Sequence, residues 1–365
     1  MDSGGGGVRA GWKEKAVGEI LQLEYGKPLD AADRMPDGCH PVYGANGEIG
    51  RTDKFYYDKP SIIIGRKGSA GEINLTEEEF WPLDVTYFVT FDEHQYDLRF
   101  IFYLLTTLEL PKLAKGVKPG INRNEVYAQT TKVPPLPEQQ RIVRILDLAF
   151  EGIATAKANT GNNLKNARAV FVSELNAIFT QRGDGWKETT VDKISTNLDS
   201  KRVPITKNVR KSGEYPYYGA SGIVDYVSDY IFDGDTLLVS EDGANLLARS
   251  TPIAFSVSGK YWVNNHAHIL KFEHMATQRL VEFYLDSIKL DEYITGAAQP
   301  KLNQKALNAI PIPIPITVDA QTEIVERIDA LQDETQRLES IYKLKISALD
   351  DLKKSLLHEA FNGNF

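Results

Sequence analysis

Two loops in this chain carry charged side chains between glycines, a combination suited to hydrogen bonding with a planar, charged ligand. In the first loop, Arg66, Lys67 and Ser69 lie between Gly65 and Gly71, directly after an apolar run. Glycine lets a backbone approach a ligand closely, and an arginine guanidinium can donate to the O6 and N7 acceptors of guanine. These residues are therefore candidate DNA contacts, and a solvated hairpin turn is the alternative interpretation.

The second loop follows the apolar run Thr236–Ser240 and carries acids where the first carries cations. Glu241 and Asp242 can accept a hydrogen bond from the amino group of cytosine, and the Asn245 amide can pair with adenine. A charged surface turn is an equally good interpretation of these residues. If both loops contact DNA, their opposite charges predict that they recognise different bases.

Several other polar segments are candidates for contact with phosphates or bases. The loops around Pro119 and Pro300 are rich in amides and cations. The segment Asn264–His268 combines donors and acceptors, but structural hydrogen bonding is an alternative, and its His-x-His pair has no evident third metal ligand. Two tyrosine turns can either contact the DNA backbone or pack as ordinary turns. The further candidate contacts are Tyr43, Asn46, Lys115, Lys118, Asn122, Arg123, Tyr218, Ser221, Asn265, His266, Gln299, Lys301 and Asn303.

The elements that must position these residues occur twice in the chain. Three segments recur in the same order, as Gly11–Glu14 and Gly185–Glu188, Pro41–Gly47 and Pro216–Gly222, and Pro119–Asn122 and Pro300–Asn303. The repeated unit is about 175 residues long, the size of a whole domain with a connector. Such a duplication makes a pseudo-twofold axis available and suits a ligand that is itself roughly twofold.

Each repeat begins with a mixed region and ends with a helical one. Short apolar runs at Ser61–Gly65 and Thr236–Ser240 predict buried strands, and helices are expected near Asp97–Leu108 and Thr277–Ile288. From Ile324 to Leu356, apolar residues recur at alternating four- and three-residue steps, which is a heptad pattern. The first copy of this pattern is looser and is interrupted at 159–163. Both helices follow proline-rich stretches, at 133–137 and 310–315, which are expected to be stiff helix entries.

These patterns predict an α+β protein with two similar domains separated by two long antiparallel coiled-coil helices, related by a pseudo-twofold axis. Helices that pack only on their own domains are the alternative. The expected boundaries are a flexible tail at 1–10, a first domain at 11–135, a helix at 136–184, a second domain at 185–316 and a second helix at 317–365.

Composition limits the class of protein. The 365 residues carry a formal net charge of −8, so a DNA-binding surface must be local, or a partner must supply part of the phosphate neutralisation. The single cysteine, Cys39, excludes an intramolecular disulfide and a thiolate metal cluster. Since no apolar run approaches the length of a bilayer span and no secretion signal is evident, we expect a cytoplasmic protein without a membrane partner.

One segment resembles a known family. Pro134–Val143 reads Pro-Pro-Leu-Pro-Glu-Gln-Gln-Arg-Ile-Val, which is similar to a signature of type I restriction–modification specificity subunits. The second copy, Val318–Val325, keeps the glutamine, isoleucine and valine but lacks Pro-Glu. The resemblance covers essentially residues 11–365 and follows the family's domain order.

The resemblance implies a non-catalytic subunit that binds double-stranded DNA. In this family each domain is a target recognition domain for one half of a split sequence, and the helices set the gap. DNA methyltransferase subunits, two in number, dock on the scaffold, and restriction subunits can join. No methyltransferase, nucleotide-binding or nuclease motif is evident, and no cofactor is expected. The alternative is a duplicated scaffold that binds peptide or another polymer, with an enzyme acting between its domains as a third possibility.

Overall fold

The computed structural model describes residues 11–296 and 299–365, so the predicted tail at 1–10 lies outside the described residues. The chain forms two compact units. Unit 1 comprises the described residues up to Thr160 together with Leu344–Phe365, and unit 2 comprises Gly161–Lys343. Each unit therefore contains one mixed domain and a part of both long helices, which the sequence-based boundaries treat as separate segments.

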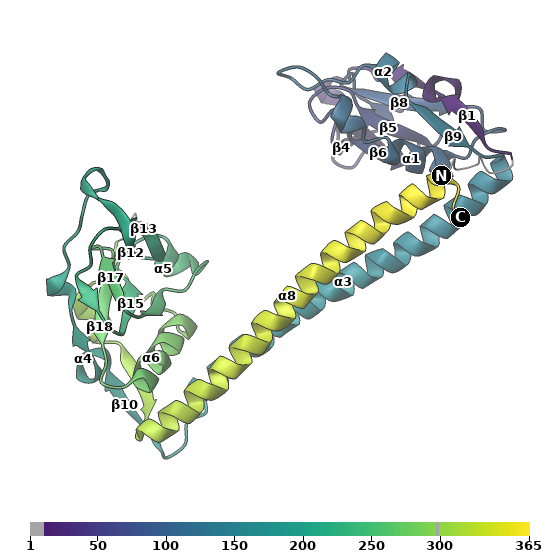
Figure 1. The fold of residues 1–365 in the computed structure, drawn as a ribbon. Coiled ribbons are helices and arrows are strands. Elements are labelled where there is room, and N and C mark those ends of the chain that lie inside the picture. Colours follow the sequence, from purple (N-terminus) through teal and green to yellow (C-terminus); the bar gives the residue numbers. More distant parts are fainter. Residues whose placement is uncertain (1–10, 297–298) are drawn as a thin grey trace, which may run out of the picture. The chain divides into compact units, whose positions relative to one another are not determined.

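The domain in unit 1 is built from three sheets (Figure 1). A four-stranded antiparallel sheet has the order β2-β8-β5-β6, a second sheet has the order β4-β3-β7, and β1 pairs with β9. The elements are β1 Lys13–Ala16, β2 Leu21–Tyr25, β3 His40–Gly44, β4 Gly47–Thr52, β5 Ser61–Gly65, β6 Ile73–Thr76, β7 Trp81–Pro82, β8 Thr86–Phe91, α1 Leu98–Thr107, α2 Arg123–Tyr127 and β9 Thr130–Val133.

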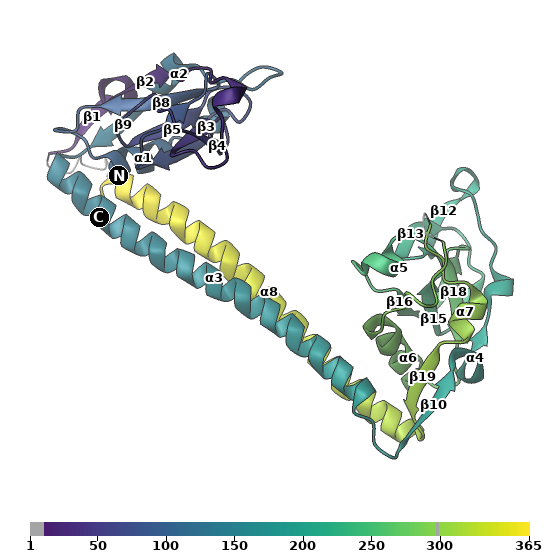
Figure 2. The same ribbon diagram turned by 180° about the vertical axis from the view of Figure 1, so that it is seen from behind.

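The domain in unit 2 repeats this plan (Figure 2). Its sheets have the orders β11-β18-β15-β16 and β13-β12-β17-β14, of which the second has one strand more than its counterpart in unit 1, and β10 pairs with β19. The elements are β10 Trp186–Thr190, α4 Val191–Ile194, β11 Thr196–Asn197, β12 Ser212–Gly219, β13 Gly222–Val227, β14 Phe232–Asp233, β15 Thr236–Ser240, α5 Asn245–Ala248, β16 Ala254–Val257, β17 Lys260–Val263, β18 Ala267–Lys271, α6 Met275–Ser287, α7 Gln304–Asn308 and β19 Pro311–Pro315.

One of the two inner strands of each four-stranded sheet is buried along its whole length. Every residue of β5 and of β15 is buried, as expected for short apolar runs that are covered on both faces. The helices α1 and α6 lie within two residues of the predicted bounds and bury apolar faces against these sheets. The Asp97 carboxylate accepts from the Phe100 amide at 3.0 Å and so caps α1. The sequence thus correctly predicts an α+β domain in each half.

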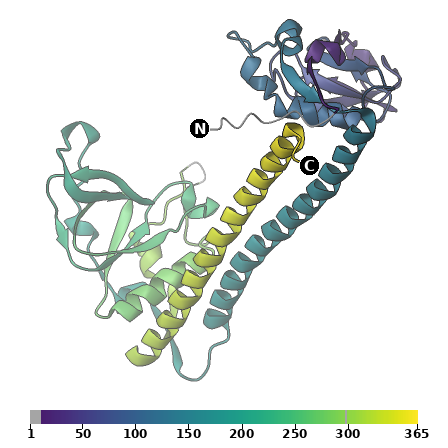
Figure 3. The same ribbon diagram turned by 45° about the vertical axis from the view of Figure 1, so that its right-hand side comes forward.

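The long helices α3, Leu136–Thr180, and α8, Val318–Asn362, pack against each other in both units (Figure 3). In unit 2, Arg168 pairs with Glu339 at 2.7 Å and Arg327 with Glu174 at 3.1 Å, which requires that the two helices run antiparallel. The hydrogen bonds from Arg168 lower the pKa of Glu339 to about 2. In unit 1, Lys157 pairs with Asp350 at 2.5 Å and Lys353 Nζ lies 4.9 Å from the Phe150 ring centroid, which gives the same antiparallel direction. The predicted pairing of two long helices is confirmed.

The helix α3 runs unbroken through 159–163, as the single helix expected at 136–184 requires, so the polar residues there interrupt the apolar stripe but not the helix. One detail differs from the sequence-based expectation. The second proline-rich stretch is not only a helix entry, because Pro311–Pro315 forms β19 and pairs antiparallel with β10. Its prolines alternate with Ile312 and Ile314, and proline is tolerated in an edge strand. None of the described helices combines the length and the apolar character needed to cross a membrane.

Candidate nucleic-acid interface

In unit 1, two loops that are distant in sequence are joined by backbone hydrogen bonds. The loop that follows β5 meets the loop that precedes α2. The Gly68 amide donates to the Pro119 carbonyl at 2.9 Å, and the Ile121 amide donates to the Arg66 carbonyl at 3.0 Å. Gly68 has a φ of +83°, which favours glycine, and open space surrounds the position of its missing side chain. The arrangement brings the predicted residues Arg66, Lys67 and Lys118 onto one pair of joined loops.

Unit 2 builds the same pair of loops with the same hydrogen bonds. The Gly243 amide donates to the Pro300 carbonyl at 3.0 Å, and the Leu302 amide donates to the Glu241 carbonyl at 2.8 Å. Gly243 has a φ of +110°, like its counterpart Gly68. The backbone therefore makes Glu241 the structural equivalent of Arg66, and the charge difference noted in the sequence falls on matching positions of a common scaffold.

An aromatic ring of β2 lies close to two guanidinium groups of the unit 1 loops. The Arg66 guanidinium lies 5.2 Å from the Tyr25 ring centroid, and that of Arg123 lies 5.1 Å from the same ring. Arg66 also donates from Nε and Nη2 to the Asp84 carbonyl, at 3.1 and 2.6 Å. Tyr25 is 45% exposed although it stands at the end of a core strand. Sequence reasoning missed Tyr25, because it is far along the chain from both arginines.

Among the other predicted residues of these loops, some side chains are exposed to solvent and others already form an ion pair or a hydrogen bond. Lys67 and Lys118 are exposed, and Ser69 is half-buried. Lys115 pairs with Glu125 at 2.5 Å, which partly neutralises it. The Asn122 carboxamide accepts from the Asn124 amide at 2.9 Å and caps α2, so its oxygen already has a structural role.

The two turn tyrosines pack into their domains. Tyr43 is 8% exposed and contacts Phe80 edge to face, and Tyr218 packs against Tyr261. Burial raises the pKa of both hydroxyls, Tyr43 and Tyr218, above the ordinary value. This packing matches the alternative of an ordinary turn tyrosine. The hairpin tips beside them, at Asn46 and Ser221, are exposed.

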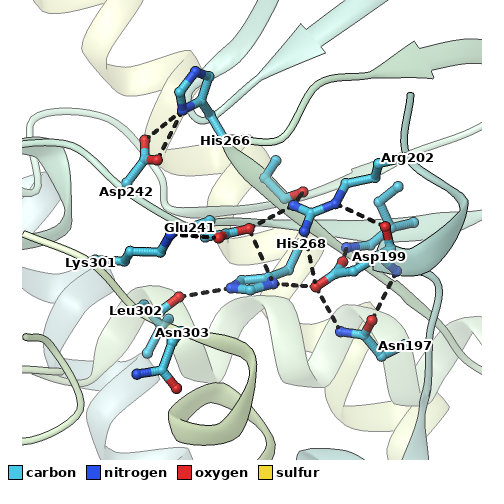
Figure 4. A network of polar contacts seen from close by, with 12 residues as sticks. Asn197, Asp199, Arg202, Glu241, Asp242, His266, His268, Lys301, Leu302 and Asn303 are labelled. Carbon is cyan, nitrogen blue, oxygen red and sulfur yellow. Dashed lines mark hydrogen bonds and ion pairs between the residues drawn. The ribbon is translucent and has the colours of Figure 1, made fainter. Parts of the chain in front are cut away.

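In unit 2 the acidic loop is neutralised by its own surroundings (Figure 4). Glu241 is 9% exposed, and its carboxylate lies 2.6 Å from Arg202 Nη1 and 3.1 Å from Lys301 Nζ. Arg202 also donates to the Ala267 carbonyl at 2.8 Å. A buried carboxylate held by two cations is not free to accept from a cytosine amino group without breaking these contacts. Glu241 is therefore not the exposed acid of a charged surface turn, and its contact with DNA stays a prediction.

Asp242 and Asn245 are also engaged within the domain. The Asp242 carboxylate lies 2.9 Å from His266 Nδ1 (Figure 4). The Asn245 side chain donates to the Thr251 carbonyl at 3.0 Å and accepts from the Thr251 amide at 3.1 Å, which closes the loop around α5. A further candidate, Asn303, accepts from the Ala306 amide and caps α7. Asn265 and Gln299 are exposed.

The buried residue of the His-x-His pair is His268, which belongs to a closed polar network. Its Nδ1 lies 2.5 Å from Asp199 Oδ2, and its Nε2 lies 2.7 Å from the Leu302 carbonyl (Figure 4). Burial raises the pKa of Asp199, but the hydrogen bond and charge of His268 and the charge of Arg202 outweigh it, so the pKa is lowered. Burial also acts to raise the pKa of Glu241, but the hydrogen bonds and charges of its cationic neighbours outweigh it, so this pKa is lowered as well.

This network tests the idea of a metal centre. Asp199, Glu241 and His268 offer ligand atoms that lie within 4.8 Å of one another, so acidic neighbours that the sequence did not reveal do surround one of the histidines. Arg202 lies 2.6 Å from Glu241 and 3.5 Å from Asp199, so its positive charge already balances the carboxylates that a metal ion would need. The three residues form an ion-pair network with Arg202, and the absence of a metal site stays a prediction.

A known family model matches both halves of the chain. The family model described as "Type I restriction modification DNA specificity domain" matches residues 9–166 and again residues 183–346. The chain belongs to this family.

Relatives of the chain carry the same description. It is 22% identical to a putative type I specificity subunit of Mycoplasma genitalium, over 96% of this chain and 94% of that protein. It is 37% identical to a putative type I restriction enzyme specificity subunit of Haemophilus influenzae over 40% of this chain, a match that spans 37% of that protein. The EcoDI specificity subunit of Escherichia coli is 21% identical over 96% of this chain.

Solved structures share the fold. A chain from a study of complex assembly and conformational transition of the type I restriction–modification system aligns with a TM-score of 0.77 at 14% identity, covering 98% of this chain and all of that chain. The HsdS subunit of Thermoanaerobacter tengcongensis aligns with a TM-score of 0.63 at 15% identity over the full length of both chains.

Proposed function

We propose that this chain selects the DNA target of a type I restriction–modification complex, with each recognition domain reading one half of a split sequence. The observation that carries the proposal is the duplicated pair of joined loops, which has one backbone design and different side chains in the two units. A single backbone with different side chains is what two different half-sites require. A peptide-binding scaffold is not favoured by membership of a DNA specificity family.

Partner subunits carry out the catalytic steps in this proposed complex. The chain supplies recognition, and methyltransferase subunits, two per chain, supply methyl transfer in the cytoplasm. Restriction subunits can join this complex. A net charge of −8 limits counterion release by the chain alone, so we expect weak binding to DNA until a methyltransferase subunit is added. A gel shift with and without that subunit tests this, and tight specific binding by the isolated chain at physiological salt would contradict it.

Within unit 1, we assign the first DNA contacts to Arg66, Arg123 and Tyr25. Stacking on Tyr25 and hydrogen bonding to Asp84 hold the Arg66 guanidinium in place before DNA arrives, which lowers the cost of ordering it on binding. Its Nη1 and the second hydrogen of Nη2 remain for DNA. The exposed Lys67 and Lys118 are assigned to phosphates.

Arg66→Ala tests whether this arginine contacts a base. For a bidentate contact with guanine, we expect a loss of about 1–3 kcal/mol at one base position of one half-site. The matched control is Lys118→Ala, which should weaken all sequences alike and reduce the salt dependence of binding. A loss for Arg66→Ala that is equal on every sequence would instead make Arg66 a phosphate contact.

A further inference from the structure

Each long helix begins with a buried glutamine that ties it to its domain. Gln139 is the fourth residue of α3 and is 1% exposed, and Gln321 is the fourth residue of α8 and is 5% exposed. The Gln139 amide donates to the carbonyls of Gln95 and Pro134, at 3.0 and 2.9 Å, and accepts from the Asp97 amide at 3.0 Å. One side chain thus connects the helix, the preceding proline segment and the start of α1.

Gln321 makes the equivalent connections in unit 2. Its amide donates to the Pro315 carbonyl at 2.9 Å, and its oxygen accepts from the Thr277 hydroxyl at 2.5 Å. Thr277 lies in the first turn of α6, the counterpart of α1. The same polar attachment therefore occurs twice, although the surrounding motif has lost Pro-Glu in the second copy.

A second attachment follows eight residues later in both helices. In unit 1, Asp147 accepts from the Tyr103 hydroxyl and lies 3.3 Å from Arg99 Nε. In unit 2, Asp329 lies 2.6 Å from Arg279 Nη2. Eight helical residues correspond to a rise of about 12 Å. Two contacts this far apart therefore fix α3 to α1 in unit 1 and α8 to α6 in unit 2.

Apolar residues between the two attachment points already stabilise the contact, so the buried polar groups must have another role. Ile142 and Leu146 are fully buried in the core of unit 1, and Val325 and Ile328 are buried in unit 2. Apolar contact is not directional, whereas hydrogen bonds and ion pairs fix a rotation and a register. Burying an amide costs free energy unless all its partners are in place, which makes any other orientation of the helix unfavourable.

We infer that Gln139 with Asp147, and Gln321 with Asp329, are positioning residues that fix each recognition domain on its helix and so restrict the gap between half-sites. This inference rests on the proposed function. Changing the gap by one base pair moves a half-site by about 3.4 Å and rotates it by about 35°. A recognition domain that is bound to its helix at two points resists that rotation. A domain held only by apolar packing would rotate more easily.

The test measures methylation by the full complex on DNA in which the two half-sites are separated by the natural gap or by one or two base pairs more or fewer. The variant is the double substitution Gln139→Leu with Gln321→Leu, and the control is Gln140→Leu, an exposed neighbour on the same helix. We expect the wild type and the control to prefer one gap sharply. The double variant should lose at least about threefold of that preference, because a small misplacement of bound groups has a large effect on rate, while the bases recognised stay the same.

Several outcomes decide the inference. A folded double variant with an undiminished preference for one gap would overturn it, and so would an equal loss of activity at all gaps, which marks a role in stability alone. If the leucine variant does not fold, Asp147→Asn with Asp329→Asn tests the second attachment of each helix, and Asp147→Glu with Asp329→Glu, which keeps both charges, should retain the preference. A wild-type complex that methylates no split site would instead remove the proposed function itself.

Discussion

Replacing Arg202 with methionine should destabilise unit 2 selectively. The substitution keeps a similar apolar stem but removes the cation that faces Glu241 at 2.6 Å and Asp199 at 3.5 Å. The side chains of these three residues are at most 14% exposed, so solvent cannot replace the lost charge. Breaking a buried ion pair from one side costs about 3–5 kcal/mol. His268 and Lys301 still face the carboxylates, which places the expected loss near the lower end, about 3 kcal/mol.

The loss should depend on pH in a defined direction. The folded-state pKa values of Asp199 and Glu241 are lowered, so their ion pairs stabilise the protein fully above the unfolded values near 4. That contribution disappears as the pH falls through the lower folded-state values. The difference in stability between wild type and Arg202→Met should therefore be greatest at neutral pH and should shrink below about pH 4.

Thermal unfolding combined with hydrogen exchange can measure this effect. A loss of about 3 kcal/mol corresponds to a fall in Tm of roughly 6–12 °C for a unit of this size. Exchange should accelerate in β15, β18 and the loop before α7, and it should not change in β5. Arg337→Met is the control, because this exposed arginine pairs among the described residues with Glu334, one turn away, and an exposed ion pair contributes little to stability. An unchanged Tm, or a loss that is as large at pH 3 as at pH 7, would refute the assigned role of Arg202.

Two further predictions follow from the same structure. Burial raises the pKa of Asp286 to about 6, so ionisation of its carboxyl group weakens the fold as the pH rises from about 4 to 6. Asp286→Asn keeps an acceptor for the amides of Ile253 and Ala254, and it should stabilise the protein by about 1–2 kcal/mol at pH 8, as measured by chemical unfolding. The gain should be smaller at pH 4. Inserting four helix-forming residues near 158–161 adds about 6 Å and just over one turn to α3, and should lengthen the preferred gap by about one or two base pairs without changing the bases read; an active insertion variant with the natural gap would exclude α3 as the determinant of spacing.

The sequence predicted the elements that depend on local pattern. The strands β5 and β15 have the predicted bounds because short apolar runs between turn residues have few other ways to be buried. The heptad pattern likewise predicted α8, which runs from Val318 to Asn362. The duplicated motifs predicted that the two halves would share one topology, and their sheet orders agree apart from β14, an additional strand in unit 2.

The features that local pattern could not predict depend on tertiary contacts. Tyr25 becomes a candidate contact only because β2 brings its ring close to two arginines that are distant in sequence. Glu241 looks like an open surface acid until Arg202 and Lys301 are placed beside it. The strand β19 escaped prediction because proline is usually a strand breaker, and only pairing with β10 at the sheet edge makes it acceptable.

The most direct test of the account is to map DNA methylation in cells that express the methyltransferase subunit with this chain, or with a chimera in which residues 186–316 come from a relative. The account predicts a split target for the wild type, and for the chimera a target in which one half-site changes while the other half and the gap persist. Methylation at a continuous site, or a chimera in which both half-sites change together, would contradict the claim that each domain reads its own half.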